Sequence, residues 1–191
     1  MYRSTISMVL VVSLSGALHG CLGPAVVSAG IGAAMMSEDP RTAGTIVDDR
    51  IIVSKLSSRI KDKYPNQAKV HVTTYNNVVL LTGQVASESI KDDLQLMVLE
   101  TQSVRDFKDE TTVGEFSSFK EFSKDGAIKT QVVSLLTRSK DVRIVRVNTT
   151  VELGTVYLMG LVTRDEGETA AQIAASVKGA SKIVKIFEYV D

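Results

Sequence analysis

The chain has 191 residues, and its 22 lysines and arginines balance its 22 aspartates and glutamates. This neutral balance argues against a nucleic-acid binder driven by overall charge, and the length suits one medium domain or two small ones. A single cysteine excludes an internal disulfide and a multi-thiolate metal site, and two histidines, His19 and His71, leave little material for histidine-based catalysis.

The N-terminus carries the features of a bacterial export signal. Arg3 precedes an apolar run over residues 8–18, which is shorter than the ~20 residues that span a bilayer. The sequence Leu18-His19-Gly20-Cys21 then resembles the bacterial lipoprotein signal, although His19 stands where a small or Thr-like residue is usual. This resemblance implies a signal peptide over 1–20 and an acylated N-terminus at Cys21. The alternative is a buried free cysteine beside a discarded signal.

The residues after Cys21 predict where the chain goes and how it is held. Leu22 follows the cysteine, and in the sorting pattern of such lipoproteins a residue other than aspartate implies the outer membrane. Residues 21–45 are rich in Gly, Ala and Ser and predict a lipidated flexible tether with an r.m.s. span of roughly 25–30 Å. Its apolar side chains either rest near lipid or pack on the folded part; they are Val26, Val27, Ile31, Met35 and Met36.

Two segments separated by 77 positions repeat one another. Residues 76–85, NNVVLLTGQV, match residues 153–162, LGTVYLMGLV. The same order of periodic elements surrounds both segments, which predicts two structurally similar units.

The first expected unit, residues 46–114, begins with a helix that Asp48 or Asp49 can cap. Its buried stripe is expected at Ile52, Leu56 and Ile60, which recur at i, i+4 and i+8. Asn76-Asn77 tolerates the positive φ of a tight hairpin turn. The other expected elements are strands at 69–74 and 78–82, a helix at about 87–101 and a strand at about 105–113.

The second expected unit, residues 124–191, repeats this order, with Asp125 leading its first helix. The buried stripe of this helix is expected at Ile128, Val132 and Leu135 or Leu136. Residues 163–166 form a capping box for the next helix, which Gly179 ends. The strands are expected at 143–151, 155–161 and 182–190. Each unit is therefore αββαβ, and the fold class is α+β: two tandem small domains, each a three-stranded sheet with two helices on one face.

The segment between the units, residues 115–123, is an expected linker rich in phenylalanine. Phe116, Phe119 and Phe122 recur every three residues. These rings either fasten the linker against the two domains, which is the preferred interpretation, or form an interfacial membrane segment.

The order of these elements resembles a known domain family. A helix, a hairpin ending in an apolar-x-Gly-x-Val step, a second helix and a final strand are similar to the BON domain, and LLTGQV and YLMGLV carry this resemblance twice. Over residues 18–191 the chain resembles the dual-BON outer-membrane lipoproteins of the DolP (YraP) type. The resemblance implies a periplasm-facing, phospholipid-binding lipoprotein that maintains outer-membrane integrity and can gather at division sites.

Gly83 and Gly160 lie in the two apolar-x-Gly-x-Val steps. We expect them to be structural glycines, required by a bulge or by a close approach of the backbone. The alternative is a contact with lipid or with a partner.

The sequence gives no sign of an enzyme. No nucleophile–base motif, phosphate loop or metal motif occurs, so we expect no catalytic activity, no cofactor and no metal. His71 lies between the inward Val70 and Val72 and is expected on the solvated face of its strand. The carboxylate pairs at 48–49 and 92–93 are expected to cap helices or to face solvent, because adjacent helical residues point apart.

Positive charge concentrates in the second unit, which has ten basic and eight acidic residues, against nine and ten in residues 48–113. The outer stripe of its first helix, with the flanking basic residues, is therefore the expected site for anionic phospholipid. Each cation contributes only about 1 kcal/mol there, so the acyl anchor would supply the effective concentration. The predicted binding residues are Lys124, Ala127, Lys129, Gln131, Ser134, Arg138 and Lys140.

The sequence thus predicts an anchored protein whose partner is an anionic phospholipid membrane. The first unit, near neutral, is expected to pack against the second or to meet a protein. The alternative is an accessory of envelope or outer-membrane protein assembly, or of division-site proteins, in which the basic face docks on an acidic protein and lipid binding is incidental. Neither interpretation includes nucleic acid.

Overall fold

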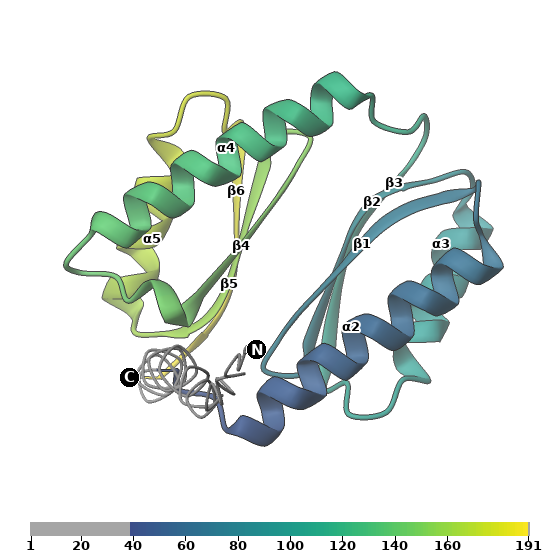
Figure 1. The fold of residues 1–191 in the computed structure, drawn as a ribbon, viewed down its shortest axis with the longest axis horizontal. Helices are drawn as coiled ribbons and strands as arrows, with labels where there is room; N and C mark the ends of the chain where they lie inside the picture. The colour runs from purple at the N-terminus through teal and green to yellow at the C-terminus, as the bar shows by residue number, and fades with distance from the viewer. Residues whose placement is uncertain (1–38, 191) are drawn as a thin grey trace, which may run out of the picture. The chain divides into compact units, whose positions relative to one another are not determined.

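The fold repeats one five-element pattern twice (Figure 1). The computed structural model describes residues 39–190, so the signal peptide, Cys21 and residues 22–38 of the expected tether lie outside the described residues. The first unit contains α2 (Ala43–Lys63), β1 (Ala68–Tyr75), β2 (Val78–Val85), α3 (Glu88–Leu99) and β3 (Asp106–Val113). The second contains α4 (Phe119–Arg138), the 3-10 turn η1 (Ile144–Arg146), β4 (Val147–Glu152), β5 (Thr155–Val162), α5 (Arg164–Ala175) and β6 (Lys182–Tyr189).

The connections set the topology of each sheet. A two-residue turn makes β1 and β2 antiparallel, whereas α3 carries the chain across so that β3 pairs parallel to β2. The second sheet has the same pattern, with β4 antiparallel and β6 parallel to the central β5. Figure 1 shows both helices of the first unit on one face of its sheet. The predicted α+β fold of two αββαβ units is confirmed.

Both hairpin turns use left-handed backbone at their two central residues. Asn76 and Asn77 have φ values of 53° and 63°, and Leu153 and Gly154 have values of 47° and 74°. This conformation matches the twist of the flanking strands, and asparagine and glycine adopt it with little strain. Leu153 is the exception, because a bulky side chain disfavours positive φ.

The first helix begins earlier than the sequence predicts. α2 starts after Thr42, whose side-chain oxygen accepts a hydrogen bond from the Thr45 N–H. The prediction that Asp48 or Asp49 caps this helix is therefore wrong, because both residues lie inside it. Asp49 is buried, and its carboxylate binds the turn between β1 and β2.

The same error applies to the first helix of the second unit. α4 starts after Ser118, which forms a capping box with Glu121, so Asp125 lies within the helix and does not lead it. The second half of the segment expected as a linker, 115–123, is thus the first turn of α4. The capping box places the N-cap at Ser118, seven residues before the Asp125 that was expected to lead the helix.

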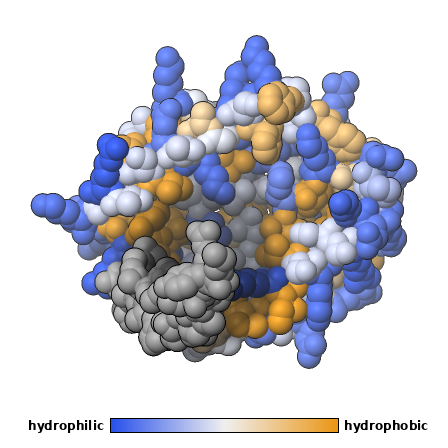
Figure 2. Space-filling view, in the orientation of Figure 1, coloured by the Kyte–Doolittle hydropathy of each residue, from blue (hydrophilic) through white to orange (hydrophobic). Residues whose placement is uncertain are grey.

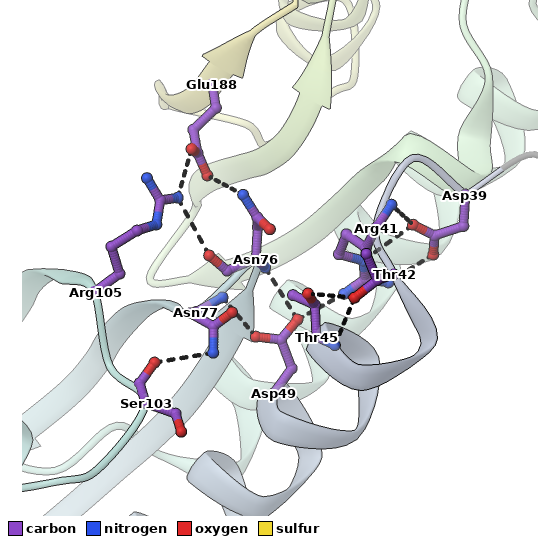
Figure 3. A network of polar contacts seen from close by, with 10 residues as sticks. All are labelled: Asp39, Arg41, Thr42, Thr45, Asp49, Asn76, Asn77, Ser103, Arg105 and Glu188. Carbon is purple, nitrogen blue, oxygen red and sulfur yellow. Dashed lines mark hydrogen bonds and ion pairs between the residues drawn. The ribbon is translucent and has the colours of Figure 1, made fainter.

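The two buried aspartates hold the hairpin turns. Asp49 accepts the backbone N–H of Asn76 at 3.0 Å and that of Asn77 at 2.8 Å, as Figure 3 shows. Asp125 makes the corresponding contacts with the turn between β4 and β5. Each carboxylate therefore ties a helix to a turn whose N–H groups have no partner within the hairpin ladder.

Each sheet buries one face against its own two helices. In the first unit Ile52, Leu56 and Ile60 of α2 pack against the sheet and α3, as expected. In the second unit the buried stripe of α4 runs through Ile128, Val132 and Leu136. Leu135 is 39% exposed, so the stripe ends at Leu136.

The other faces of the two sheets pack on each other. We call this contact the sheet seam; it comprises Tyr75, Val78, Leu80, Tyr157 and Met159. Hydrogen bonds across its margin join Thr73 to Thr150 and Gln84 to Glu152. Because β2 is covered on both faces, all of its residues are buried, which explains its unbroken apolar run. The first unit thus packs against the second. This is one of the two roles predicted for the nearly neutral first unit, the other being contact with a protein.

Gly83 and Gly160 lie where the neighbouring strand leaves no room for a side chain. A Cβ on Gly83 would lie 2.1 Å from the carbonyl oxygen of Lys69, and one on Gly160 would lie 2.2 Å from that of Arg146. Gly83 also has a φ of 114°, which disfavours any other residue. The close approach is to β1 for Gly83 and, for Gly160, to the end of η1 where it joins β4.

Candidate functional site

The exposed surface of α4 is positively charged. The helix carries Lys120, Lys124, Lys129 and Arg138 against two acidic residues, Glu121 and Asp125. Both carboxylates accept backbone N–H bonds, Glu121 from Ser118 and Asp125 from the β4–β5 turn. In Figure 2, hydrophilic side chains project along the edge over α4, with hydrophobic atoms exposed near its N-terminal end.

A groove of about 680 Å³ runs along one side of α4. We call it the α4 groove; its lining includes Lys124, Ala127 and Gln131 from α4, Leu153 from the β4–β5 turn, and Lys178 and Ser181 from the loop after α5. Three residues of the predicted phospholipid site therefore lie together. Leu153, which is 45% exposed, gives the groove an apolar wall, and Lys178 gives it a second cation; the carboxylates of Glu121 and Asp125 also line it and accept backbone N–H bonds.

The opposite side of α4 faces the first unit. A cleft of about 300 Å³ lies there, between α4, β1 and β4, and Lys129 and Phe122 line it. His71 and Lys69 line the same cleft from β1 and are exposed, as expected for the solvated face of that strand. Lys129 thus lies on the other flank of the helix from Lys124.

The remaining predicted residues lie farther along the chain. Ser134 is half-buried, and Arg138 is the exposed last residue of α4. Arg138 follows Lys124 by fourteen residues, or roughly 21 Å of helix. Lys140 lies beyond the helix and lines a separate cavity of about 250 Å³ with Arg143 and Arg146. The predicted set is therefore a strip along α4, with the α4 groove at its N-terminal half.

The three phenylalanines between the units differ in how far the fold covers them. Phe116 is 41% exposed, Phe122 is 56% exposed and Phe119 is 83% exposed. The preferred interpretation from sequence, in which these rings pack on the domains, is therefore wrong for Phe119, whereas Phe122 lines the cleft between α4, β1 and β4. The capping box places Phe119 and Phe122 on the first turns of a helix, where Phe119 projects into solvent.

Polar contacts fix the start of α4 to both sheets. The Ser117 N–H and hydroxyl donate to Gln84 Oε1 at 2.9 and 3.0 Å, and Gln84 Nε2 donates to Glu152 at 2.6 Å. Lys69 Nζ donates to the Ser117 carbonyl at 3.0 Å. Hydrogen bonds from Ser118 lower the pKa of Glu121 below its ordinary value. The N-terminal end of α4 therefore has a defined position.

A second polar network ties the units together at the β1–β2 turn (Figure 3). Arg105 pairs with Glu188 of β6, and the Asn76 side chain donates to the same carboxylate at 3.1 Å. Arg41 pairs with Asp49 at 2.9 Å and lies over the Tyr75 ring at 3.9 Å from its centroid. This network anchors the start of α2 and the turn beside the sheet seam.

Within residues 39–190, no group of histidine, cysteine or carboxylate side chains is arranged to hold a metal ion. In the same part of the chain, none of the helices has the length and apolar character that a bilayer crossing requires.

Comparison with known proteins matches this architecture to one family. The BON domain matches residues 48–115 and 124–191. The outer membrane lipoprotein DolP of Haemophilus influenzae is 35% identical over 176 residues, which cover 91% of this chain and 91% of that protein. A 21 kDa hemolysin of Actinobacillus pleuropneumoniae is 30% identical over 154 residues, which cover 80% of this chain and 79% of that protein.

Among solved structures, the C-terminal domain of CdsD, a structural protein of the Type III secretion system of Chlamydia trachomatis, is 12% identical to this chain. It aligns with a TM-score of 0.32 and covers 71% of this chain and 98% of that domain. A TM-score this low supports no inference about function.

Two matched domains over most of the chain show that it belongs to the BON domain family. It is a dual-BON outer-membrane lipoprotein of the DolP type, lipid-anchored and facing the periplasm.

Proposed function

We propose that this lipoprotein is attached through acylated Cys21 and binds anionic phospholipid through the α4 surface of its second BON domain. In this proposal it is not an enzyme, and it helps to maintain outer-membrane integrity, including at division sites. The observation that carries the proposal is the α4 groove, which places Lys124 and Lys178 beside an apolar wall that includes Leu153.

The chemistry of the α4 groove suits a phospholipid headgroup and the top of its acyl region. Two lysines can meet phosphate oxygens, while Ala127 and Leu153 offer apolar contact in the same groove. Each lysine near an anionic surface contributes about 1 kcal/mol, so the strip is too weak to hold a soluble protein by itself. The acyl anchor supplies the high effective concentration that makes such weak contacts useful.

The proposal is tested with chain 22–191, which keeps every described residue and lacks Cys21. Its co-sedimentation is measured with vesicles of phosphatidylcholine containing graded phosphatidylglycerol, at low and high salt. We expect binding that rises with the anionic fraction and weakens with salt. Equal binding to neutral and anionic vesicles would contradict headgroup selection by α4.

A protein partner is the second candidate, favoured by one observation. Leu96 and Leu99 of α3 are 56% and 67% exposed and lie three residues apart on the first unit, away from the α4 strip. Such a pair suits the groove of another protein better than an anionic headgroup. No binding of chain 22–191 to any vesicle would favour this candidate, with Cys21 as the remaining membrane contact.

A further inference from the structure

Helix α3 of the first unit carries an exposed stripe that is both apolar and acidic. Glu88, Asp92 and Leu96 recur every four residues and Leu99 follows three residues later, so the four side chains share one helix face, which we call the α3 stripe. Leu96 and Leu99 are 56% and 67% exposed. We propose that the α3 stripe binds the α4 groove of a second copy of this chain. This inference deepens the proposed function, on whose α4 groove it rests, by giving that groove a protein ligand beside the phospholipid.

The fold itself does not require leucine at these two positions, as the second unit shows. Counted from the N-cap of each helix, Leu96 and Leu99 correspond to Gln172 and Ala175 of α5. Both of these α5 residues are exposed as well. A polar or a small residue therefore suffices at the same place in the same fold, so the two leucines are available for an interaction outside their own unit.

The charge of the α3 stripe selects the kind of surface that can cover it. Glu88 and Asp92 are exposed, while Lys91, the one cation in the sequence of α3, donates to the Thr111 carbonyl at 2.8 Å. Anionic headgroups repel such a stripe. The stripe instead fits a partner surface that combines an apolar wall with lysines or arginines.

The α4 groove has these complementary features. Lys124 and Lys178 line it beside the apolar side chain of Leu153. Its other charged groups, the carboxylates of Glu121 and Asp125, accept backbone N–H bonds. The groove volume of about 680 Å³ lies in the range of pockets that enclose sizeable ligands, so two leucine side chains can enter it.

The stripe and the groove lie on opposite sides of the molecule. The two sheets pack on each other in the sheet seam, and each sheet is covered on its other face by its own helices. The α3 stripe therefore cannot reach the α4 groove of the same chain, so a second copy has to supply the groove. Because the two patches differ, the contact is head-to-tail and builds a chain or a ring of copies. One helix stripe makes a small interface, so we expect weak association in solution that anchoring to a shared membrane strengthens.

Sedimentation equilibrium of chain 22–191 without lipid tests this contact directly. We expect association that increases with protein concentration and decreases with salt. A stripe variant carries Leu96→Ser with Leu99→Ser, and a groove variant carries Lys124→Glu with Lys178→Glu. Each variant alone should associate about tenfold more weakly or less than that, because it lacks one half of the contact. An equimolar mixture should recover association as a dimer of one copy of each variant, because the stripe variant keeps its groove and the groove variant keeps its stripe.

The matched control changes two other exposed apolar residues of the first unit. Val47 and Ile51 of α2 are 52% and 44% exposed, and Val47→Ser with Ile51→Ser should associate as the unmodified chain does. An unmodified chain that stays monomeric at millimolar concentration and low salt would overturn the proposal. A stripe variant that associates as well as the unmodified chain, or a mixture that stays monomeric, would also overturn it.

Vesicle co-sedimentation separates this contact from lipid binding. Below the concentration at which the chain associates, the stripe variant should bind phosphatidylglycerol vesicles as well as the unmodified chain. Soluble short-chain phosphatidylglycerol should dissociate the assembly, because both ligands occupy the α4 groove; an assembly that persists under saturating lipid would contradict the shared groove. Vesicle binding by a chain that never associates would remove the second copy and leave the proposed function. Association of a chain that binds no vesicle would do the reverse.

Discussion

Asp125 in α4 accepts a hydrogen bond from the backbone N–H of Leu153, at 2.7 Å and 28 residues away in sequence. The other oxygen of the same carboxylate accepts the N–H of Gly154 at 2.9 Å. One buried side chain therefore fixes the turn that forms a wall of the α4 groove to the helix that carries most of the predicted binding residues. The shape of the groove depends on this pair.

Removing the carboxylate should destabilise the second unit. Asp125→Ala leaves two N–H groups of a left-handed turn without their charged acceptor, and each such bond contributes about 1.5–3 kcal/mol. We expect the free energy of unfolding in urea to fall by about 3 kcal/mol or more. Asp141→Ala, at an exposed loop position, is the control and should change it by less than about 0.5 kcal/mol. Equal stability of the two variants would mean that the turn does not need Asp125.

Only glycine should fit at position 160, because any side chain there would clash with the backbone of Arg146. Gly160→Ala would place a Cβ 2.2 Å from the Arg146 carbonyl oxygen and force β4 and β5 apart, at a cost of about 1–3 kcal/mol or more. Gly126→Ala is the matched control, because a Cβ there meets nothing within 4 Å. That change lies in α4 and should stabilise the protein by up to about 1 kcal/mol. Thermal unfolding of both variants should show shifts of opposite sign, and a stable Gly160→Ala would contradict the contact.

Leu80 and Leu81 should report on different parts of the protein. Both are fully buried and adjacent on β2, but Leu80 lies in the sheet seam and Leu81 in the core of the first unit. Leu81→Ala should lower the stability of the first unit by about 2–5 kcal/mol. Leu80→Ala should instead weaken the coupling between the units.

Amide hydrogen exchange separates these two effects. We expect Leu80→Ala to speed exchange most across the seam strands, and Leu81→Ala to speed it most in α2, α3 and β2. If both variants unfolded in a single transition with the same exchange pattern, the two units would be one cooperative core without a separable seam.

The sheet seam should also lose stability at high pH. Burial raises the pKa of Tyr75 to about 12, and burial together with the Glu110 charge raises the pKa of Tyr157 to about 12. Because the ordinary value is 10.0, folding favours the protonated form. This stabilisation is fully present below pH 10 and is lost as the pH rises towards 12.

Tyrosinate absorbance and urea unfolding check this dependence. In a pH titration, Tyr75 and Tyr157 should ionise with a late phase that the denatured chain lacks. Tyr157→Phe should remove part of that phase and should lose less stability between pH 10 and 12 than the unmodified chain. Titration of all four tyrosines of chain 22–191 in one step near pH 10 would contradict a buried seam.

Much of the fold could be predicted because its signals are local. Ile52, Leu56 and Ile60 repeat with helical period. The same order of elements recurs 77 residues later, so that each unit supports the prediction for the other. The helix starts were wrong for a reason that is equally physical. Aspartate near a helix start usually caps it, but Asp49 and Asp125 cap nothing and instead bind turns 27 to 29 residues away.

The candidate site was only partly predictable for the same reason. Lys124, Ala127 and Gln131 share one helix face, which periodicity can identify. Lys178 and Leu153 reach the α4 groove from loops that only the folded chain brings together. The exposure of Phe119 has a local sequence signal, since the Ser118–Glu121 capping box places Phe119 and Phe122 on a helix.

The central claim is that the cations of the α4 groove select anionic phospholipid. Its most direct test is vesicle co-sedimentation of chain 22–191 carrying Lys124→Glu and Lys178→Glu, beside a control carrying Lys55→Glu and Lys61→Glu on exposed positions of α2. Both variants change the net charge equally. We expect the groove variant to lose tenfold or more of its affinity for phosphatidylglycerol vesicles at low salt, roughly 1 kcal/mol per lysine, and the control to bind nearly as well as the unmodified chain. Equal losses in the two variants would show that overall charge governs binding and would contradict a site on α4.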